Sequence, residues 1–129
     1  MKNKLLIGLL YLFFLSCSTS VDAVNAELLG LWDWTSTSGG FAGTITTPES
    51  TGTIRSLEFT ESMLRVYENG TLISEGTYRI ETRLSTLFDE PREMLVQDNG
   101  FQQIIEVNSS QLLLIGDCTD CFNSEYRRE

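Results

Sequence analysis

The sequence predicts an all-β domain, an eight-stranded up-and-down antiparallel barrel that follows a cleaved N-terminal signal helix. From Glu27 onward, short apolar or alternating runs recur at intervals of about 8–12 residues, which is typical of β-sandwiches and barrels. Turn residues separate these runs, and no long helical period interrupts them. The predicted strands are residues 28–34, 53–59, 63–68, 71–81, 93–97, 101–107, 111–116 and 122–128.

Tight turns between consecutive runs favour the up-and-down order. Asn69-Gly70 and Asn99-Gly100 are two-residue hairpin signals, because both residue types tolerate positive φ. Residues 108–110 and 117–121 predict two further short connections. Eight strands joined in this way can close on themselves and so remove their exposed edges.

The run 71–81 shows the clearest alternation of side chains between two faces. One face is mostly apolar or small and the other is mostly charged or polar, as expected of a barrel wall with one wet side. The inward face is predicted to carry Leu72, Ser74, Gly76, Tyr78 and Ile80. The small residues on that face would leave room for a neighbour's bulk or for a ligand.

Two stretches do not fit the hairpin pattern. Residues 35–52 are rich in Gly, Ser and Thr and contain Pro48, and residues 84–92 have a hydrophobic centre and contain Pro91. Long loops in compact domains are often functional, but a plain solvated connection explains residues 35–52 equally well. Residues 84–92 are expected to form one helical turn or a loop that leans on the barrel mouth.

Composition excludes several classes of function. The chain has 129 residues, a formal charge of −9 and no histidine, which excludes Ser-His-Asp and Cys-His catalytic pairs and the usual zinc sites that contain histidine. Both lysines precede Cys17, and from there on seven arginines stand against eighteen acidic residues, a formal charge of −11. So acidic a chain is repelled by the phosphates of nucleic acid, and its length fits a single domain.

The first sixteen residues have the organisation of a secretory signal. Lys2 and Lys4 open the chain, and the eleven residues 5–15 follow without a charge. This run is too short to cross a bilayer, which takes about 20 apolar residues. The alternative is a plain N-terminal anchor or a buried helix.

The residues Phe14-Leu15-Ser16-Cys17 resemble a bacterial lipobox, with phenylalanine where leucine is usual at the outermost position. The resemblance implies cleavage before Cys17 and acylation of Cys17 with palmitate-type chains, which would anchor the protein to a membrane of the cell envelope. By resemblance to the sorting rules of enteric bacteria, the following Ser18 favours the outer membrane. The expected organisation is a signal peptide at 1–16, an acylated cysteine and tether at 17–26, and a barrel domain at 27–129.

The run Gly30-Leu31-Trp32 resembles the Gly-x-Trp signature of lipocalins and related calycin barrels. In that family the Trp closes the base of the barrel, and an Arg near the end of the last strand packs across it. The matching residues here are Gly30, Trp32 and either Arg127 or Arg128. A guanidinium over an indole contributes about 0.5–2 kcal/mol of cation–π attraction. Together with residues 38–43 and 47–52, the pattern resembles small lipocalin-like lipoproteins of Bacteroidota.

The resemblance and the alternation together indicate which side chains could line a ligand cup. The candidates are Trp34, Phe41, Ser74, Gly76, Tyr78, Phe101 and Tyr126. Inward aromatic residues are more often plain core than ligand contacts. The chain is shorter than a typical lipocalin, so the barrel is expected either to be filled by its own side chains or to hold one small ligand.

The motif Cys118-Thr119-Asp120-Cys121 is the sharpest local pattern. A redox Cys-x-x-Cys usually opens a helix, whose N-terminus lowers a thiol pKa, whereas this motif lies between two predicted strands and beside acidic residues. We therefore expect a Cys118–Cys121 disulfide that staples the last hairpin outside the cytoplasm. A metal site made from both thiols with Asp117 and Asp120 would lack a second pair of cysteine or histidine ligands.

These observations favour a non-enzymatic, membrane-anchored, lipocalin-like lipoprotein without a cofactor or a metal. We expect it to bind a small apolar ligand or a peptide in the cell envelope. A second interpretation is a solid-core barrel that docks a protein partner through residues 35–52 or an acidic face. A third, a thiol redox or hydrolytic enzyme, would need an activated thiol or a carboxylate pair at a fixed separation, and no spacing singles out such a pair.

Overall fold

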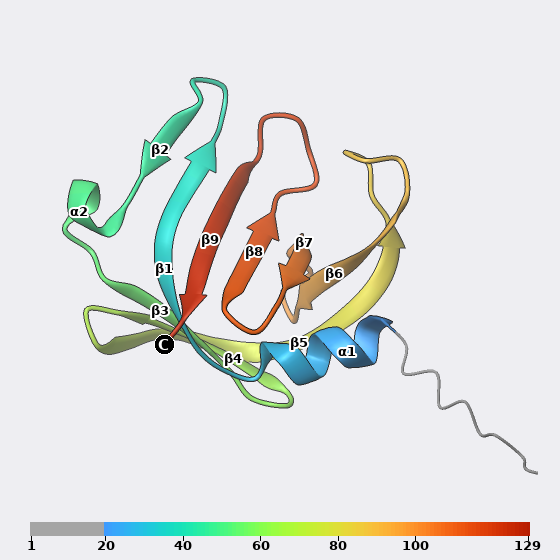
Figure 1. Cartoon of the computed structure of the whole chain (residues 1–129), viewed down its shortest axis with the longest axis horizontal. Coiled ribbons are helices and arrows are strands. Elements are labelled where there is room, and N and C mark those ends of the chain that lie inside the picture. The colour runs from blue at the N-terminus through green and yellow to red at the C-terminus, as the bar shows by residue number, and fades with distance from the viewer. Residues whose placement is uncertain (1–19) are drawn as a thin grey trace, which may run out of the picture.

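The fold is a closed barrel of eight antiparallel strands, as predicted (Figure 1). The computed structural model describes residues 20–129, so the predicted signal peptide 1–16 and the predicted acylation site Cys17 lie outside the described residues. The barrel strands are β1 (Gly30–Gly39), β3 (Arg55–Phe59), β4 (Met63–Glu68), β5 (Thr71–Leu84), β6 (Pro91–Gln97), β7 (Gln102–Val107), β8 (Gln111–Ile115) and β9 (Phe122–Arg128). Each predicted strand is therefore present, some with shifted ends.

The barrel has the up-and-down order that the short connections predicted. Each barrel strand pairs with the next one along the chain, and β1 pairs with β9 to close the ring. Asn69 and Gly70 have φ values of 49° and 79°, so the β4–β5 hairpin uses the predicted Asn-Gly turn. β5 changes partners along its length, because residues 71–77 pair with β4 and residues 78–84 pair with β6.

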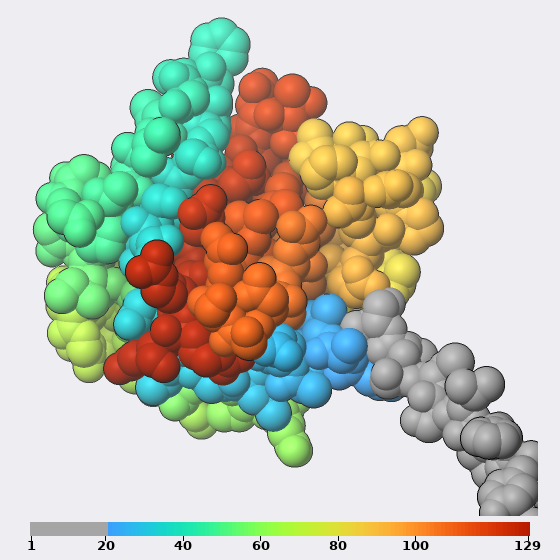
Figure 2. Space-filling model, viewed as in Figure 1, coloured from blue at the N-terminus to red at the C-terminus, as the bar shows by residue number. Residues whose placement is uncertain are grey.

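Residues 35–52, expected to be a loop, are mostly regular structure. β1 turns back into β2 (Thr44–Thr46), a short strand that pairs with β1. Helix α2 (Pro48–Thr51) follows, because Thr47 caps its N-terminus and Gly52 ends it with φ 68°. The β1–β2 hairpin stands clear of the body of the molecule (Figure 2).

The expected tether is helical where the structure describes it. Helix α1 (Ser20–Leu28) lies across one end of the barrel (Figure 1). Val21, Val24 and Leu28 recur at helical spacing and pack into the core. The prediction that the folded domain begins only at residue 27 is therefore wrong. The small polar residues of this segment suggested a tether, but the apolar residues among them form a stripe that packs on the barrel. Within the described residues, no helix has the length and apolar character needed to cross a membrane.

Trp32 and Arg128 close the barrel at the end covered by α1, which we call the closed end. Trp32 is fully buried, and its indole donates a hydrogen bond to the carbonyl oxygen of Leu28 at 2.8 Å. The guanidinium carbon of Arg128 lies 4.1 Å from the centroid of the Trp32 ring. A Cβ on Gly30, whose φ is 118°, would stand 3.0 Å from Nη1 of Arg128. Glycine at position 30 therefore leaves room for the guanidinium.

Arg128 also ties separate chain segments together. Its guanidinium donates hydrogen bonds to the carbonyl oxygens of Glu27, of Leu29 at 2.7 Å and of Ser109 at 2.8 Å. The neighbouring Arg127 is exposed. The structure thus places Arg128 over Trp32, a choice between two arginines that the sequence left open.

A second apolar cluster lies on the outer face of the barrel. Its buried members alternate with core residues along β6, β7 and β8, and they are Met94, Val96, Ile104 and Ile115. Residues 85–90, which join β5 to β6, are hydrogen-bonded to Asp117, which follows β8. The β5–β6 segment is therefore tied to the loop that follows β8.

We expect Arg128→Ala to lower the free energy of unfolding by about 2–4 kcal/mol, because it removes the cation–π contact and three hydrogen bonds from a charged donor. Urea unfolding followed by tryptophan fluorescence measures this change. Arg127→Ala, at the exposed neighbouring position, is the matched control and should change stability by about 0.5 kcal/mol or less. Equal losses in the two variants would contradict this account of the closed end.

Candidate functional site

The end of the barrel opposite α1, which we call the mouth, contains a cavity of about 300 Å³ that is open to solvent. β3 runs from Arg55 at the mouth to Phe59 at the closed end, where it pairs with Gly30. The side chains that line the cavity are Arg55, Leu57, Leu64, Val66, Glu68, Ile73, Leu95, Gln97, Gln103, Leu114 and Tyr126. The leucines are buried and form an apolar floor, whereas the charged and amide side chains are more exposed and form a polar rim.

Of the seven side chains predicted to line a ligand cup, Tyr126 alone lines the mouth cavity. Trp34 is buried, and its indole donates to Oγ1 of Thr37 at 2.9 Å, while Thr37 shares a 2.8 Å hydrogen bond with Ser124. A bulge at Thr35 brings Trp34 and Thr37 to the same side of β1. Trp34 therefore supports the wall of the barrel and is not part of the cavity surface.

A second bulge changes which residues of β5 face the mouth. Val66 of β4 pairs with Ser74, but Tyr67 pairs with Leu72, so Ile73 is the extra residue. Ile73, although 53% exposed, therefore lines the mouth cavity, whereas Leu72, predicted to point inward, is 44% exposed and does not line it. The regular alternation predicted for the whole of residues 71–81 is wrong at this point.

Ser74 and Gly76 border a separate small hollow of about 50 Å³. A Cβ on Gly76 would come within 2.7 Å of Oδ2 of Asp98. The glycine therefore makes room for a side chain of the β6–β7 turn. It was predicted to make room either for such a neighbour or for a ligand, and the structure shows the first.

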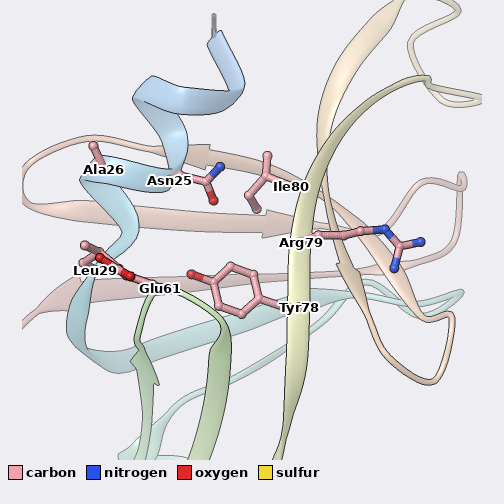
Figure 3. Close-up of a pocket in the computed structure, with 7 residues that line it drawn as sticks. All are labelled: Asn25, Ala26, Leu29, Glu61, Tyr78, Arg79 and Ile80. Atoms are coloured by element: carbon pink, nitrogen blue, oxygen red, sulfur yellow. The ribbon is translucent and has the colours of Figure 1, made fainter. Parts of the chain in front are cut away.

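Tyr78 belongs to a different hollow, an open one of about 380 Å³ beside α1 (Figure 3). This hollow forms where β5 continues past the end of its pairing with β4. The Tyr78 hydroxyl donates to the carbonyl oxygen of Thr60 at 2.5 Å, and burial, followed by the charge of Glu61, raises the pKa of Tyr78. Arg79 points away from α1 in Figure 3. Because the Tyr78 hydroxyl already donates its hydrogen bond within the protein, we take the mouth as the candidate site.

Two aromatic candidates lie outside the barrel, so the prediction that they line a cup is wrong. Phe41 is 96% exposed at the tip of the β1–β2 hairpin, where the turn carries it away from the core. Phe101 is 54% exposed in the turn before β7, beside Phe122 at an outer hollow of about 390 Å³. Both side chains belong to turns, in which strand alternation no longer determines direction.

The mouth holds an ion pair that the sequence analysis did not single out. Arg55 donates through Nη2 and Nε to Oε1 of Glu68, at 2.7 and 3.2 Å. The guanidinium carbon of Arg55 also lies 5.3 Å from the centroid of the Trp34 ring. Strand alternation could have identified both charges, because Arg55 shares a face with Leu57 on β3, and Glu68 shares a face with Val66 on β4.

Tyr126 adds an uncharged hydroxyl to the mouth. Burial raises the pKa of Tyr126, against the opposing effects of the Arg55 charge and a hydrogen bond with Ser124. The phenol therefore keeps its proton at neutral pH. The charges among the lining side chains are then one positive and one negative, carried by Arg55 and Glu68.

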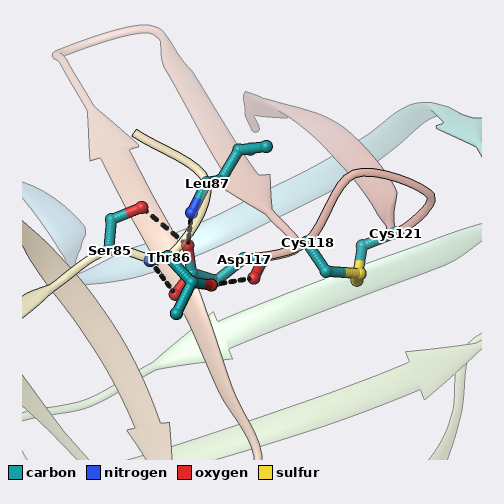
Figure 4. The surroundings of a disulfide bond; sticks show 6 residues. All are labelled: Ser85, Thr86, Leu87, Asp117, Cys118 and Cys121. Atoms are coloured by element: carbon teal, nitrogen blue, oxygen red, sulfur yellow. Dashed lines mark hydrogen bonds between the residues drawn. A yellow bond between two sulfur atoms is a disulfide. The ribbon is translucent and has the colours of Figure 1, made fainter. Parts of the chain in front are cut away.

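The predicted disulfide is confirmed: Cys118 and Cys121 are joined in the loop between β8 and β9 (Figure 4). Both sulfurs are engaged in this form, so neither offers a thiolate to a metal or a substrate. Between Ser20 and Glu129, the acidic and cysteine side chains do not gather into a group that could hold a metal ion. The disulfide loop is therefore a structural feature of the barrel rim.

Asp117, directly before the disulfide, clasps the β5–β6 loop (Figure 4). Its carboxylate accepts hydrogen bonds from the Ser85 hydroxyl at 2.6 Å and from the backbone amides of Thr86 and Leu87, both at 3.0 Å. Burial alone would raise the pKa of Asp117, but these hydrogen bonds hold it below its usual value. The segment expected to lean on the mouth is thus fixed to the disulfide loop.

Comparison of the chain with protein-family models, with curated proteins and with solved structures gives no match. The candidate site therefore depends on the geometry of this chain's own residues. That geometry combines a floor of buried leucines with a rim of paired charges, amides and a phenol, which can bind a small molecule.

We expect Asp117→Ala to lower the free energy of unfolding by about 1 kcal/mol at neutral pH, because the clasp is solvent-accessible. The folded-state pKa of Asp117 is lowered. The contribution of Asp117 to the free energy of unfolding is therefore fully present above the pKa of a carboxyl group in the unfolded chain, about 3.9. It is lost as the pH falls through the lower pKa that Asp117 has in the folded protein. Urea unfolding at a series of pH values measures the difference between variant and wild type. That difference should shrink under acid conditions, whereas the control Asp120→Ala should show little change at any pH.

Proposed function

We propose that this protein is a non-enzymatic, membrane-anchored lipoprotein that binds a small, largely apolar ligand in the mouth of its barrel. The observation that carries the proposal is the mouth cavity itself, which remains open above a closed end filled by Trp32. A barrel of eight strands has an interior that is either just filled or holds one small ligand. Here one end is filled and the other is not.

The composition of the cavity supports a ligand with an apolar body. The buried floor consists of leucine side chains from β3, β4, β6 and β8, and burying apolar ligand surface there is favourable by about 25 cal/mol per Å². A volume of about 300 Å³ lies at the lower end of the range for ligand pockets. The ligand is therefore small.

The sequence motif at Cys17 supports anchoring of the chain in a membrane of the cell envelope, with the outer membrane favoured. Cys17 itself lies outside the described residues. α1 begins at Ser20 and lies across the closed end of the barrel. In the proposed arrangement, the closed end faces the membrane and the mouth opens away from it, toward the aqueous space that supplies the ligand.

A second candidate function is docking of a protein partner through the β1–β2 hairpin. The hairpin projects from the barrel (Figure 2). Phe41 at its tip and Ile45 on β2 are 96% and 68% exposed. Large apolar side chains that project in this way are typical of interaction sites.

For the ligand-binding proposal, we expect Ile73→Trp to fill the mouth and to abolish capture of a bound species. Native mass spectrometry of the purified protein, after incubation with a total lipid extract of bacterial envelopes, measures this. Leu72→Trp is the matched control, because it adds the same bulk at the adjacent position, which does not line the cavity, and should leave capture unchanged. If wild-type protein captures nothing, or if both variants capture the same species, the mouth is not a ligand site.

For the anchoring proposal, we expect radiolabelled palmitate supplied to growing cells to be incorporated into the wild-type chain and not into Cys17→Ala. A Cys118→Ser/Cys121→Ser double variant keeps Cys17 and is the control for the other two cysteines. It should incorporate the label as the wild type does. Label retained by Cys17→Ala would show that the acylation assignment is wrong.

A further inference from the structure

The mouth contains one charge of each sign, and β3 and β4 turn their other charges outward. Arg55 and Glu68 line the cavity. Glu58 and Arg65, on the same two strands, are paired with each other at 2.8 Å and belong to the opposite face of the sheet. The ion pair at the mouth is thus separate from the ion pairs of the outer wall.

The pairing leaves hydrogen-bonding capacity on both partners. Nε and Nη2 of Arg55 share a single oxygen of Glu68, Oε1. Among residues 20–129, neither Nη1 of Arg55 nor Oε2 of Glu68 makes a hydrogen bond. One donor of Arg55 and one acceptor of Glu68 therefore remain available to a ligand at the rim of the cavity.

The remaining polar groups of the mouth are neutral. Gln97 and Gln103 offer amides that both donate and accept, and the Tyr126 phenol keeps its proton because burial raises its pKa. Below them lies the leucine floor, in which Leu57 and Leu114 are each 4% exposed. The cavity thus matches an amphiphile whose apolar end points inward and whose head reaches the rim.

The balance of charge decides which head groups fit. A carboxylate at the rim would share Arg55 with Glu68, which places two like charges around one cation. An ammonium group would share Glu68 with Arg55, which places two positive charges around one carboxylate. Like charges brought together in a partly desolvated site oppose binding strongly. A head that has a donor and an acceptor but no net charge avoids both conflicts.

We propose that the mouth selects a small amphiphile whose head group bears a hydrogen-bond donor and acceptor and no net charge. The Arg55–Glu68 pair recognises that head and rejects charged analogues. This inference rests on the proposed function, because it specifies the ligand class of the same site.

Three probes of equal chain length test the inference: octanamide, octanoate and octylammonium. Their binding to the purified full-length protein is measured by chemical-shift changes in its NMR spectrum, with the mouth residues assigned. We expect the wild type to bind octanamide about tenfold or more tightly than either charged probe.

Substitutions within the pair should invert this preference in opposite directions. Glu68→Gln leaves a net positive mouth and should favour octanoate, whereas Arg55→Gln leaves a net negative mouth and should favour octylammonium. The double variant Arg55→Gln/Glu68→Gln is neutral and should keep the preference for octanamide. Glu58→Gln removes a charge from the outer face of β3 and is the control, with wild-type selectivity. Circular dichroism checks that each variant is folded.

The outcomes separate this inference from the proposed function. If the probes bind at the mouth with equal affinity, or if Glu68→Gln and Arg55→Gln leave the order unchanged, the selectivity is wrong although ligand binding stands. If octanoate binds the wild type most tightly, the neutral-head assignment is likewise overturned. If no probe shifts any mouth residue, and Ile73→Trp and Leu72→Trp behave alike with the lipid extract, the proposed function fails as well.

Discussion

The contact between Trp32 and Arg128 is the constraint on which the rest of the barrel depends. It joins the first and last strands, because Trp32 of β1 pairs directly with Arg128 of β9. The same guanidinium holds the carbonyl oxygens at the end of α1 and in the β7–β8 turn. The Arg128 side chain therefore fixes the closure of the ring, the position of α1 on the barrel and the turn that joins β7 to β8. The layer above this contact, where Trp34 pairs with Tyr126, marks the transition from solid core to mouth.

The strands could be predicted from the sequence because Asn-Gly turns and alternation act within a few residues. The closure, which joins the first strand to the last, was expected only from the resemblance of Gly30-Leu31-Trp32 to a known barrel signature. The lining of the mouth could not be read in the same way, because the bulges at Thr35 and Ile73 invert the faces of β1 and β5 beyond them. Arg55 and Glu68 are a different case, since no bulge separates them from the core leucines of β3 and β4. Their inward direction follows from strand alternation, but alternation was argued from the sequence only for residues 71–81.

The arginines of the described residues divide into those on the outer wall and those that face the interior of the barrel. On the outer wall, Arg65 lies between Glu58 and Glu75, and Arg92 lies between Glu90 and Glu106. Such exposed pairs contribute little to stability, typically about 0–1 kcal/mol each, but they cover a wall that is rich in acidic residues. The Arg55–Glu68 pair is exposed to a similar degree, with side chains that are 36% and 33% exposed, but it lines the mouth cavity. Under the proposed function, this position makes the Arg55–Glu68 pair available to a ligand, which the pairs of the outer wall are not.

The two sides of the mouth differ in how firmly they are held, which bears on how a ligand would enter. The wall made by β6, β7 and β8 is buried on both faces, by the core inside and by the cluster of Met94, Val96, Ile104 and Ile115 outside. The hydrogen bonds of Asp117 tie the β5–β6 segment to the loop that follows β8. The first part of β5, residues 71–76, is paired with β4 on one side only and is largely exposed. Segments with few buried contacts open at the lowest free-energy cost. Ile73 belongs to this weakly held segment, so widening of the mouth should occur by displacement of the start of β5, while the opposite wall keeps Gln97 and Gln103 in place.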